Sequence, residues 1–287
     1  MAYEQYRPSG FSLLPTVVKN LLIINGIFFL ATYVLQNQGV DLVDMLGLHY
    51  FKSEKFRAYQ FITYMFMHGS LAHIAFNMLA VWMFGQAIEN MWGPKRFLQY
   101  YIITGLGAAL LHYAVVYFEI QPGIDAINSY MSQSHHSVDD LQALLNSGSL
   151  SKYYSPELAQ SKAAFIEKFN ELLQTNPDEA FRFSTQFMDD LKREILNAPV
   201  VVGASGAIFG LLLAYGMLFP NSLIFIYFVV PIKAKYFVII YGALELFSGI
   251  LNVPGDNVAH FAHLGGLLFG FLLIQYWKHN NRNQTPY

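Results

Sequence analysis

The sequence predicts an all-α, polytopic membrane protein whose chain crosses the bilayer six times. Of its 287 residues, 54% are hydrophobic and 13% are charged, whereas a soluble domain carries about 25% charged residues. The mean hydropathy is +0.34. The apolar residues also gather in runs that approach the length of about 20 residues a transmembrane helix needs at about 1.5 Å per residue.

Each predicted span is an apolar run between polar, glycine or proline positions. A further apolar run, 222–231, is too short to cross a membrane and ends in a proline, so we assign it to a loop. The fourth and fifth spans are close to the lower length limit. The six spans are Val17–Gln36, Phe61–Ile88, Phe97–Phe118, Gly203–Phe219, Tyr236–Leu251 and Val258–Trp277.

Positively charged residues predict that both termini are cytoplasmic, because cytoplasmic loops carry the excess of Lys and Arg. The side that holds both termini would carry eight of these residues, namely Arg7, Lys19, Lys95, Arg96, Lys233, Lys235, Lys278 and Arg282. The short loops on the opposite side would carry three, namely Lys52, Lys55 and Arg57. The N-terminal segment lacks the basic start and cleavage site of a signal peptide, so we expect the first span to be retained. We expect a multi-pass protein of a bacterial inner membrane.

A long polar segment, 119–202, separates the third and fourth spans on the non-cytoplasmic side. Ser137, Ser155 and Pro177 each stand where a helix should begin, with acidic residues following. Apolar residues recur at helical spacing after each start. We therefore expect a helical extramembrane insertion that divides the membrane domain into residues 1–118 and 203–287.

Composition excludes several functions. The net charge is −2 and no basic patch dominates, which argues against a nucleic-acid partner. The chain has no cysteine, so disulfides, thiolate metal sites and cysteine nucleophiles are excluded. We expect the lipid bilayer to be the protein's surroundings and expect no small-molecule cofactor.

Polar residues inside the predicted spans are the candidate functional residues, because polar groups at bilayer depth are costly. Ser205 stands between glycines at the start of the fourth span, and His263 lies near the start of the sixth. Both spans enter from the non-cytoplasmic face, so the two side chains lie at a similar depth, on the order of 10 Å. His73 and Asn77 are four residues apart in the second span and share one helix face.

Close packing of the fourth and sixth spans would bring Ser205 and His263 together. Glycines spaced four residues apart let two helix backbones approach closely, and the two spans carry the pairs Gly206 and Gly210, and Gly266 and Gly270. A serine needs a base at about 2.6–3.2 Å to act as a nucleophile, and the oxyanion of the attacked carbonyl needs fixed donors. His73, Asn77 and the backbone N–H of Ser205 can supply these donors. No acid is positioned to orient His263, so we predict a dyad.

These residues resemble the rhomboid intramembrane serine proteases. The similarity covers the spans from about residue 61 onward, without the long polar segment. It rests on His68-x4-His73-x3-Asn77, Gly203-x-Ser205-Gly206, Ala262-His263-Leu264-Gly265-Gly266-x3-Gly270 and Glu89-x2-Trp92-Gly93-Pro94-Lys95-Arg96-Phe97.

The resemblance implies a six-helix core with Ser205 as nucleophile, His263 as general base, and His73, Asn77 and the Ser205 N–H as the oxyanion hole. It also implies that Phe209 packs on the catalytic histidine. The implied substrates are single-span membrane proteins, cut near the outer face at small residues in helices that unwind easily. Two features depart from the family: the loop 37–59 lacks a Trp-Arg pair that many members carry, and the long segment precedes the serine. Both concern substrate access.

Two other classes of protein remain open. A catalytically inactive rhomboid-like protein would bind membrane clients, although binding alone does not require both Ser205 and His263. A metal or haem protein would use His68, His73, His260 and His263, because His260 and His263 have an allowed helical ligand spacing.

Against a metal site, no carboxylate or thiolate joins these histidines and the HExxH motif is missing. We interpret His68 and His260 as structural and expect no metal. Glu245, in the fifth span, has no partner that the sequence can name, and we assign it no role.

Overall fold

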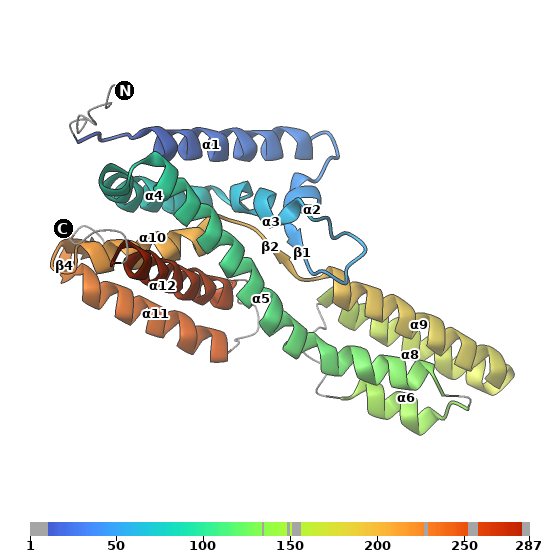
Figure 1. Cartoon of the computed structure of the whole chain (residues 1–287). Coiled ribbons are helices and arrows are strands. Elements are labelled where there is room, and N and C mark those ends of the chain that lie inside the picture. Colours follow the sequence, from blue (N-terminus) through green and yellow to red (C-terminus); the bar gives the residue numbers. More distant parts are fainter. Residues whose placement is uncertain are drawn as a thin grey trace, which may run out of the picture. The chain divides into compact units, whose positions relative to one another are not determined.

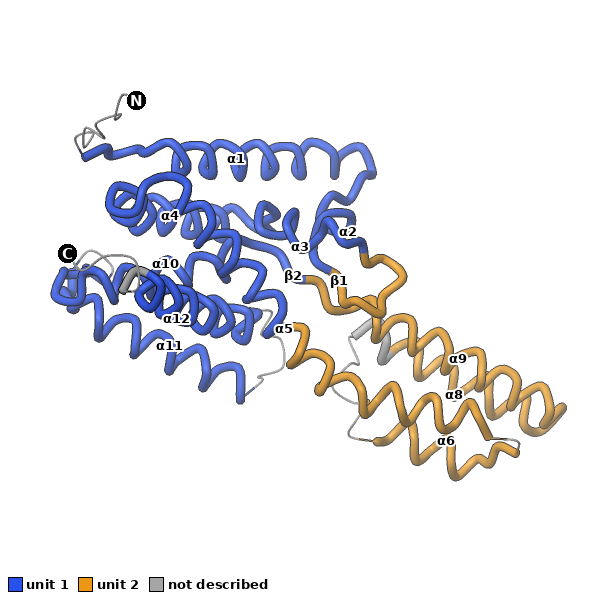
Figure 2. The backbone as a smooth tube through the Cα atoms, in the orientation of Figure 1, with its two compact units in different colours: residues 1–48, 57–112, 201–287 blue, residues 49–56, 113–200 orange. Residues whose placement is uncertain are grey.

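The computed structural model describes residues 11–133, 135–147, 150, 156–226, 229–251 and 258–282. Its regular structure is mostly helical (Figure 1). The chain divides into two compact units (Figure 2). We call residues 1–48, 57–112 and 201–287 the membrane unit, and residues 49–56 and 113–200 the helical unit.

The membrane unit contains a set of apolar helices. Among the described residues, four helices are long and apolar enough to cross a membrane, which are α1 (Thr16–Gln36), α4 (Leu71–Trp92), α5 (Pro94–Met131) and α11 (Ala234–Leu251). α10 (Ser205–Leu218) is apolar but has only 14 residues. α12 (His260–Arg282) overlaps most of the sixth predicted span and extends beyond its end. The chain is thus a mostly helical membrane protein, and six crossings remain a prediction.

The second predicted span is interrupted before His73 and Asn77. Its first part forms α3 (Gln60–Thr63) and the 3₁₀ turn η1 (Tyr64–Phe66), and α4 begins only at residue 71. Ser70 ends the irregular segment, because its hydroxyl accepts a hydrogen bond from the N–H of His73 at 3.1 Å and so caps α4. His73 therefore lies in the first turn of a helix and not in the middle of a span.

The third predicted span is longer than expected. α5 continues for 38 residues through Pro122, so its first part belongs to the membrane unit and its second part to the helical unit. The apolar run that we assigned to a loop contains the strand β3 (Leu223–Ile226) and the start of its antiparallel partner β4 (Val230–Lys233). The short helix α2 (Leu42–Leu46) follows α1.

α10 and α12 pack backbone against backbone, as the glycine spacing predicts. A Cβ atom at Gly266 would lie 1.8 Å from the carbonyl oxygen of Gly206, and one at Gly270 would lie 3.4 Å from the Cα of Gly210. α5 joins this contact, because a Cβ at Gly206 would lie 2.4 Å from the Cβ of Ala108. Glycines at the crossing therefore allow three helices to approach one another closely.

A buried carboxylate fixes the start of α1. The two oxygens of Glu89 accept hydrogen bonds from the backbone N–H groups of Val17 and Val18 at 2.9 and 2.8 Å. The first N–H groups of a helix have no partner within that helix, and a negative charge there is favourable. Glu89 thus has a structural role as the cap of α1.

The helical unit contains α6 (Val138–Leu145), α8 (Pro156–Thr175), α9 (Pro177–Asn197) and the second part of α5. Ser137 and Asn176 accept hydrogen bonds from backbone N–H groups of α6 and α9, which confirms the predicted helix starts there. The start predicted at Ser155 lies outside the described residues. Two-residue strands, β1 (Leu48–His49) and β2 (Val200–Val201), occur at the borders of this unit in the sequence.

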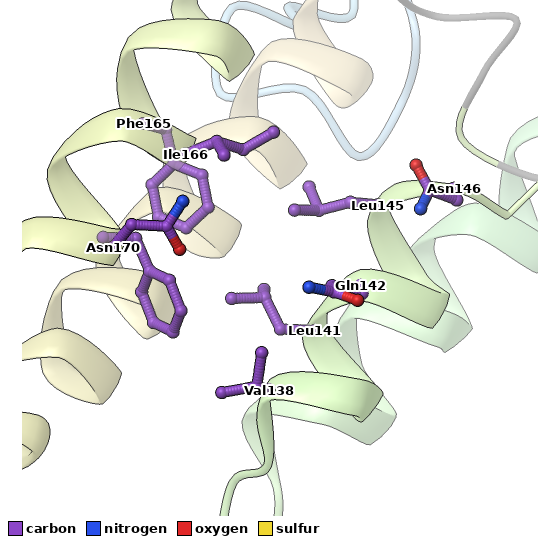
Figure 3. A pocket seen from close by; sticks show the side chains of 9 residues that line it. Val138, Leu141, Gln142, Leu145, Asn146, Phe165, Ile166 and Asn170 are labelled. Carbon is purple, nitrogen blue, oxygen red and sulfur yellow. The ribbon is translucent and has the colours of Figure 1, made fainter. Parts of the chain in front are cut away.

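The core of the helical unit combines aliphatic side chains with aromatic ones. The rings of Phe165 in α8 and Phe187 in α9 stack with their centroids 4.0 Å apart. The hydroxyl groups of Tyr130 in α5 and Ser184 in α9 are hydrogen-bonded at 2.6 Å. Between α6 and α8 lies a pocket of about 210 Å³ whose apolar floor includes Leu141 (Figure 3).

Candidate active site

Ser205 is the first residue of α10 and follows a turn that requires glycine. Gly203 has a φ of +116°, which L side chains rarely adopt, and its N–H donates to the carbonyl of Tyr64 at 2.8 Å. A Cβ at position 203 would lie 2.7 Å from Nε2 of His73 and 3.5 Å from Nδ2 of Asn77. The turn that positions Ser205 therefore runs directly against the two predicted oxyanion-hole side chains.

His263 contacts the serine. Its Nε2 lies 2.8 Å from Oγ of Ser205, although 58 residues separate them in the chain. His263 is buried in the first turn of α12, and its ring stacks on Phe209 with centroids 4.3 Å apart and an interplanar angle of 9°. The predicted proximity of serine and histidine and the implied packing of Phe209 are both confirmed.

Glu245 lies on the other side of the histidine ring. Oε2 of this buried side chain in α11 is 2.8 Å from Nδ1 of His263 and 2.6 Å from Nδ1 of His260. The expectation that no acid is positioned to orient His263 was therefore wrong, and His260, which we interpreted as structural, contacts the same acid. The two histidines lie 15 and 18 residues after Glu245, on another helix. No spacing within one helix could therefore show these contacts. The signal available was a lone carboxylate in an apolar span.

The two contacts of Glu245 have a consequence for the protons of this group. An ionised carboxylate oxygen only accepts hydrogen bonds, so with Glu245 ionised His260 and His263 each present an Nδ1–H to it. In a neutral imidazole the other nitrogen then carries a lone pair. Nε2 of His263 is thus the acceptor for the hydroxyl of Ser205, which is the arrangement that a general base requires.

A second polar group surrounds Asn77. Its Nδ2 donates to Nε2 of His68 at 2.9 Å, and the rings of His68 and His73 meet edge to face with centroids 4.9 Å apart. His68 lies in the irregular segment before α4 and is buried. It therefore orients the amide of Asn77, a role that the sequence interpretation did not assign.

The only cluster that could hold a metal ion among the described residues consists of Glu245, His260 and His263. The premise that no carboxylate joins the histidines was wrong, whereas His68 and His73 do not belong to the cluster. The contacts of 2.6 and 2.8 Å are shorter than the separation of about 3.3 Å between two ligands of a tetrahedral zinc ion with bonds of about 2.0 Å. Hydrogen bonding fits these distances better than shared coordination of zinc.

The apolar helices of this membrane protein bring a serine and a histidine within hydrogen-bonding distance, which is the arrangement that a nucleophilic serine requires. The rhomboid domain family model matches residues 55–120 and 181–279, more than half of the chain. The chain therefore belongs to the rhomboid family. The matched ranges contain Ser205, His263, His73 and Asn77, and they leave out residues 121–180.

Two relatives match most of the chain. The RHOMBOID-like protein 12, mitochondrial, of Arabidopsis thaliana is 24% identical over 87% of this chain and 55% of its own length. An uncharacterized mitochondrial rhomboid protein of Schizosaccharomyces pombe is 23% identical over 89% of this chain and 63% of its own length. The chain thus spans about three fifths of these relatives. Their mitochondrial names do not fit the expected bacterial inner membrane.

Other relatives match shorter segments and are named proteases. The rhomboid protease GlpG of Klebsiella pneumoniae is 35% identical over 27% of this chain and 29% of its own length. The rhomboid protease AarA of Providencia stuartii is 41% identical over 20% of each chain.

Proposed function

We propose that this protein is an intramembrane serine endopeptidase that cleaves transmembrane helices near the non-cytoplasmic face of the membrane. The observation that carries the proposal is the 2.8 Å contact between Oγ of Ser205 and Nε2 of His263. Both residues stand in the first turn of helices that meet at Gly206 and Gly266. The named proteases among the relatives support the same reaction class.

The reaction follows from this pair. His263 takes the hydroxyl proton on Nε2 while Oγ of Ser205 bonds to the carbonyl carbon of the scissile peptide, and the π electrons move to the carbonyl oxygen. The C–N bond then breaks as the same nitrogen returns its proton to the leaving amine. A water molecule, activated by His263 in turn, hydrolyses the acyl-enzyme and restores the serine.

Donors around the serine would stabilise the oxyanion. The Ser205 N–H opens α10, where backbone N–H groups have no partner within the helix. The amide nitrogen of Asn77 carries two hydrogens, of which one faces His68. His73 lies beside the same glycine turn. These groups form the proposed oxyanion hole, and their position is complementary to charge that develops only during reaction.

The substrates we propose are single-span membrane proteins whose helices unwind near the site. The reacting groups stand in the first turns of α10 and α12 and the first two turns of α4, so they share one end of the membrane unit. We propose that this end faces away from the cytoplasm, with both termini cytoplasmic, which agrees with the distribution of Lys and Arg.

One observation favours a second candidate. Neither relative that matches most of the chain is named a protease. A rhomboid-like protein that binds membrane clients without cleaving them is therefore the alternative. It predicts a protein that folds but never acylates a serine.

Labelling with a fluorophosphonate, together with cleavage of a model membrane substrate in liposomes, tests the two candidates. The wild type should be labelled and should cleave, and Ser205→Ala should do neither while keeping its thermal stability. Ser222→Ala removes a hydroxyl near β3 and should behave like the wild type. Normal turnover by Ser205→Ala would refute the serine mechanism, and an unlabelled, inactive but folded wild type would favour client binding.

A further inference from the structure

Glu245 has a place in the reaction that a serine–histidine dyad leaves out. Resting on the proposed function, we propose that Glu245 is a positioning residue that converts the dyad into a Ser205–His263–Glu245 triad, with His260 holding the carboxylate in place.

Both ring nitrogens of His263 are engaged along one line of hydrogen bonds. Nε2 meets Oγ of Ser205 at 2.8 Å, and Nδ1 meets Oε2 of Glu245 at 2.8 Å. The ring also lies flat on Phe209, so its rotation would break three contacts at once. The carboxylate selects the tautomer with a proton on Nδ1, and this tautomer alone leaves Nε2 free to accept the serine proton.

His260 fixes the carboxylate from a different direction. Its Nδ1 lies 2.6 Å from the same Oε2, and its ring is perpendicular to that of His263, with an interplanar angle of 89°. The side chains of His260 and Glu245 are 14% and 7% exposed. Two donors on one buried oxygen hold Glu245 more firmly than His263 alone would, since a long side chain loses several rotamers to reach one position.

A comparison with Glu89 shows why Glu245 needs a functional explanation. A buried carboxylate is costly unless it is paired or hydrogen-bonded, and more so in a membrane. Glu89 accepts from two backbone N–H groups at the start of α1, and this cap accounts for its presence. The hydrogen-bond partners of Glu245 are instead two histidines of α12, one of which contacts the proposed nucleophile.

The carboxylate acts without taking up a proton. When Nε2 of His263 receives the hydroxyl proton, the ring becomes an imidazolium, and the negative charge of Glu245 stabilises it through the Nδ1–H bond. The proton later passes from Nε2 to the leaving amine, so Glu245 remains a carboxylate in every step. Its effect is therefore on the transition state and the orientation of the base, not on substrate affinity.

The test compares Glu245→Gln with Glu89→Gln in the full chain, reconstituted in liposomes, with active sites counted by phosphonate labelling. Gln keeps the size of the side chain but removes the charge, and its amide can donate to Nδ1 and so favour the wrong tautomer. We expect kcat to fall roughly 10²–10⁴-fold in Glu245→Gln with KM nearly unchanged. Glu89→Gln should lower thermal stability and leave kcat per labelled site unchanged.

Two further measurements separate positioning from structure. Glu245→Asp restores the charge on a shorter side chain and should recover part of the activity lost in the Gln variant. In wild-type protein with ¹⁵N-labelled histidine, NMR should show His263 protonated on Nδ1, with its signal assigned by loss in a His263 variant. A wild-type kcat in Glu245→Gln, or a neutral His263 protonated on Nε2, would overturn the inference.

The failure of this inference is distinguishable from that of the proposed function. If the wild type cleaves and Ser205→Ala does not, the protease assignment stands whatever Glu245→Gln does. If Glu245→Gln does not fold, the wild-type NMR result still decides the tautomer. If the wild type is neither labelled nor active, the protease assignment fails first.

Discussion

Adding one methyl group at Gly266 should separate the serine from its base. A Cβ there would lie 1.8 Å from the carbonyl oxygen of Gly206, while ordinary van der Waals contact begins at 3.4 Å. The obstacle is backbone and not the end of a flexible side chain, so α10 and α12 must move apart by the difference, about 1.6 Å. Ser205 directly precedes Gly206, and His263 lies three residues before Gly266. Both side chains therefore move when their helices move apart.

The size of the effect follows from the hydrogen bond. If half of the movement reaches the site, the 2.8 Å contact lengthens to about 3.6 Å, beyond the range of about 2.6–3.2 Å in which a base activates a serine. A misplacement of about 1 Å costs on the order of 10²-fold in rate. We therefore expect Gly266→Ala to lower kcat about 100-fold, with a slower phosphonate labelling rate.

The assay measures cleavage of a model membrane substrate per folded molecule. Thermal unfolding in detergent shows whether each variant is folded. Gly26→Ala is the matched control, because a Cβ at this position of α1 meets nothing within 4 Å. It should keep wild-type activity and stability. A folded Gly266→Ala protein with wild-type kcat would refute the reasoning that the glycine contact sets the distance between Ser205 and His263.

Three further predictions concern the same site and its surroundings. Asn77→Ala should lower kcat roughly 10–1000-fold with little change in KM, as expected for loss of one oxyanion donor; a change in KM alone would make Asn77 a substrate-binding or packing residue. Exhaustive treatment with EDTA should leave cleavage unchanged, because the contacts of Glu245 are those of hydrogen bonds, and loss of activity that zinc restores would contradict this. Replacing residues 122–197 with a Gly/Ser linker should preserve phosphonate labelling of Ser205 and change which substrates are cut; complete loss of labelling in a folded deletion would mean that this segment helps to build the active site.

The sequence determined those parts of the site that depend on local spacing. Ser205 and His263 stand near glycine pairs four residues apart, and a spacing of four places residues on one helix face. The packing of α10 against α12, and with it the meeting of serine and histidine, could therefore be predicted. The helix starts at Ser137 and Pro177 were equally local, because a cap needs only the next three residues.

The tertiary structure alone decided which acid lies beside His263. Helical periodicity states which residues share a face of one helix, but it does not state which face of a neighbouring helix they meet. Glu245 reaches His260 and His263 only through the rotation of α11 about its axis relative to α12. That rotation is the outcome of side-chain packing along both helices, and a buried carboxylate is tolerable only in the rotation that supplies its donors.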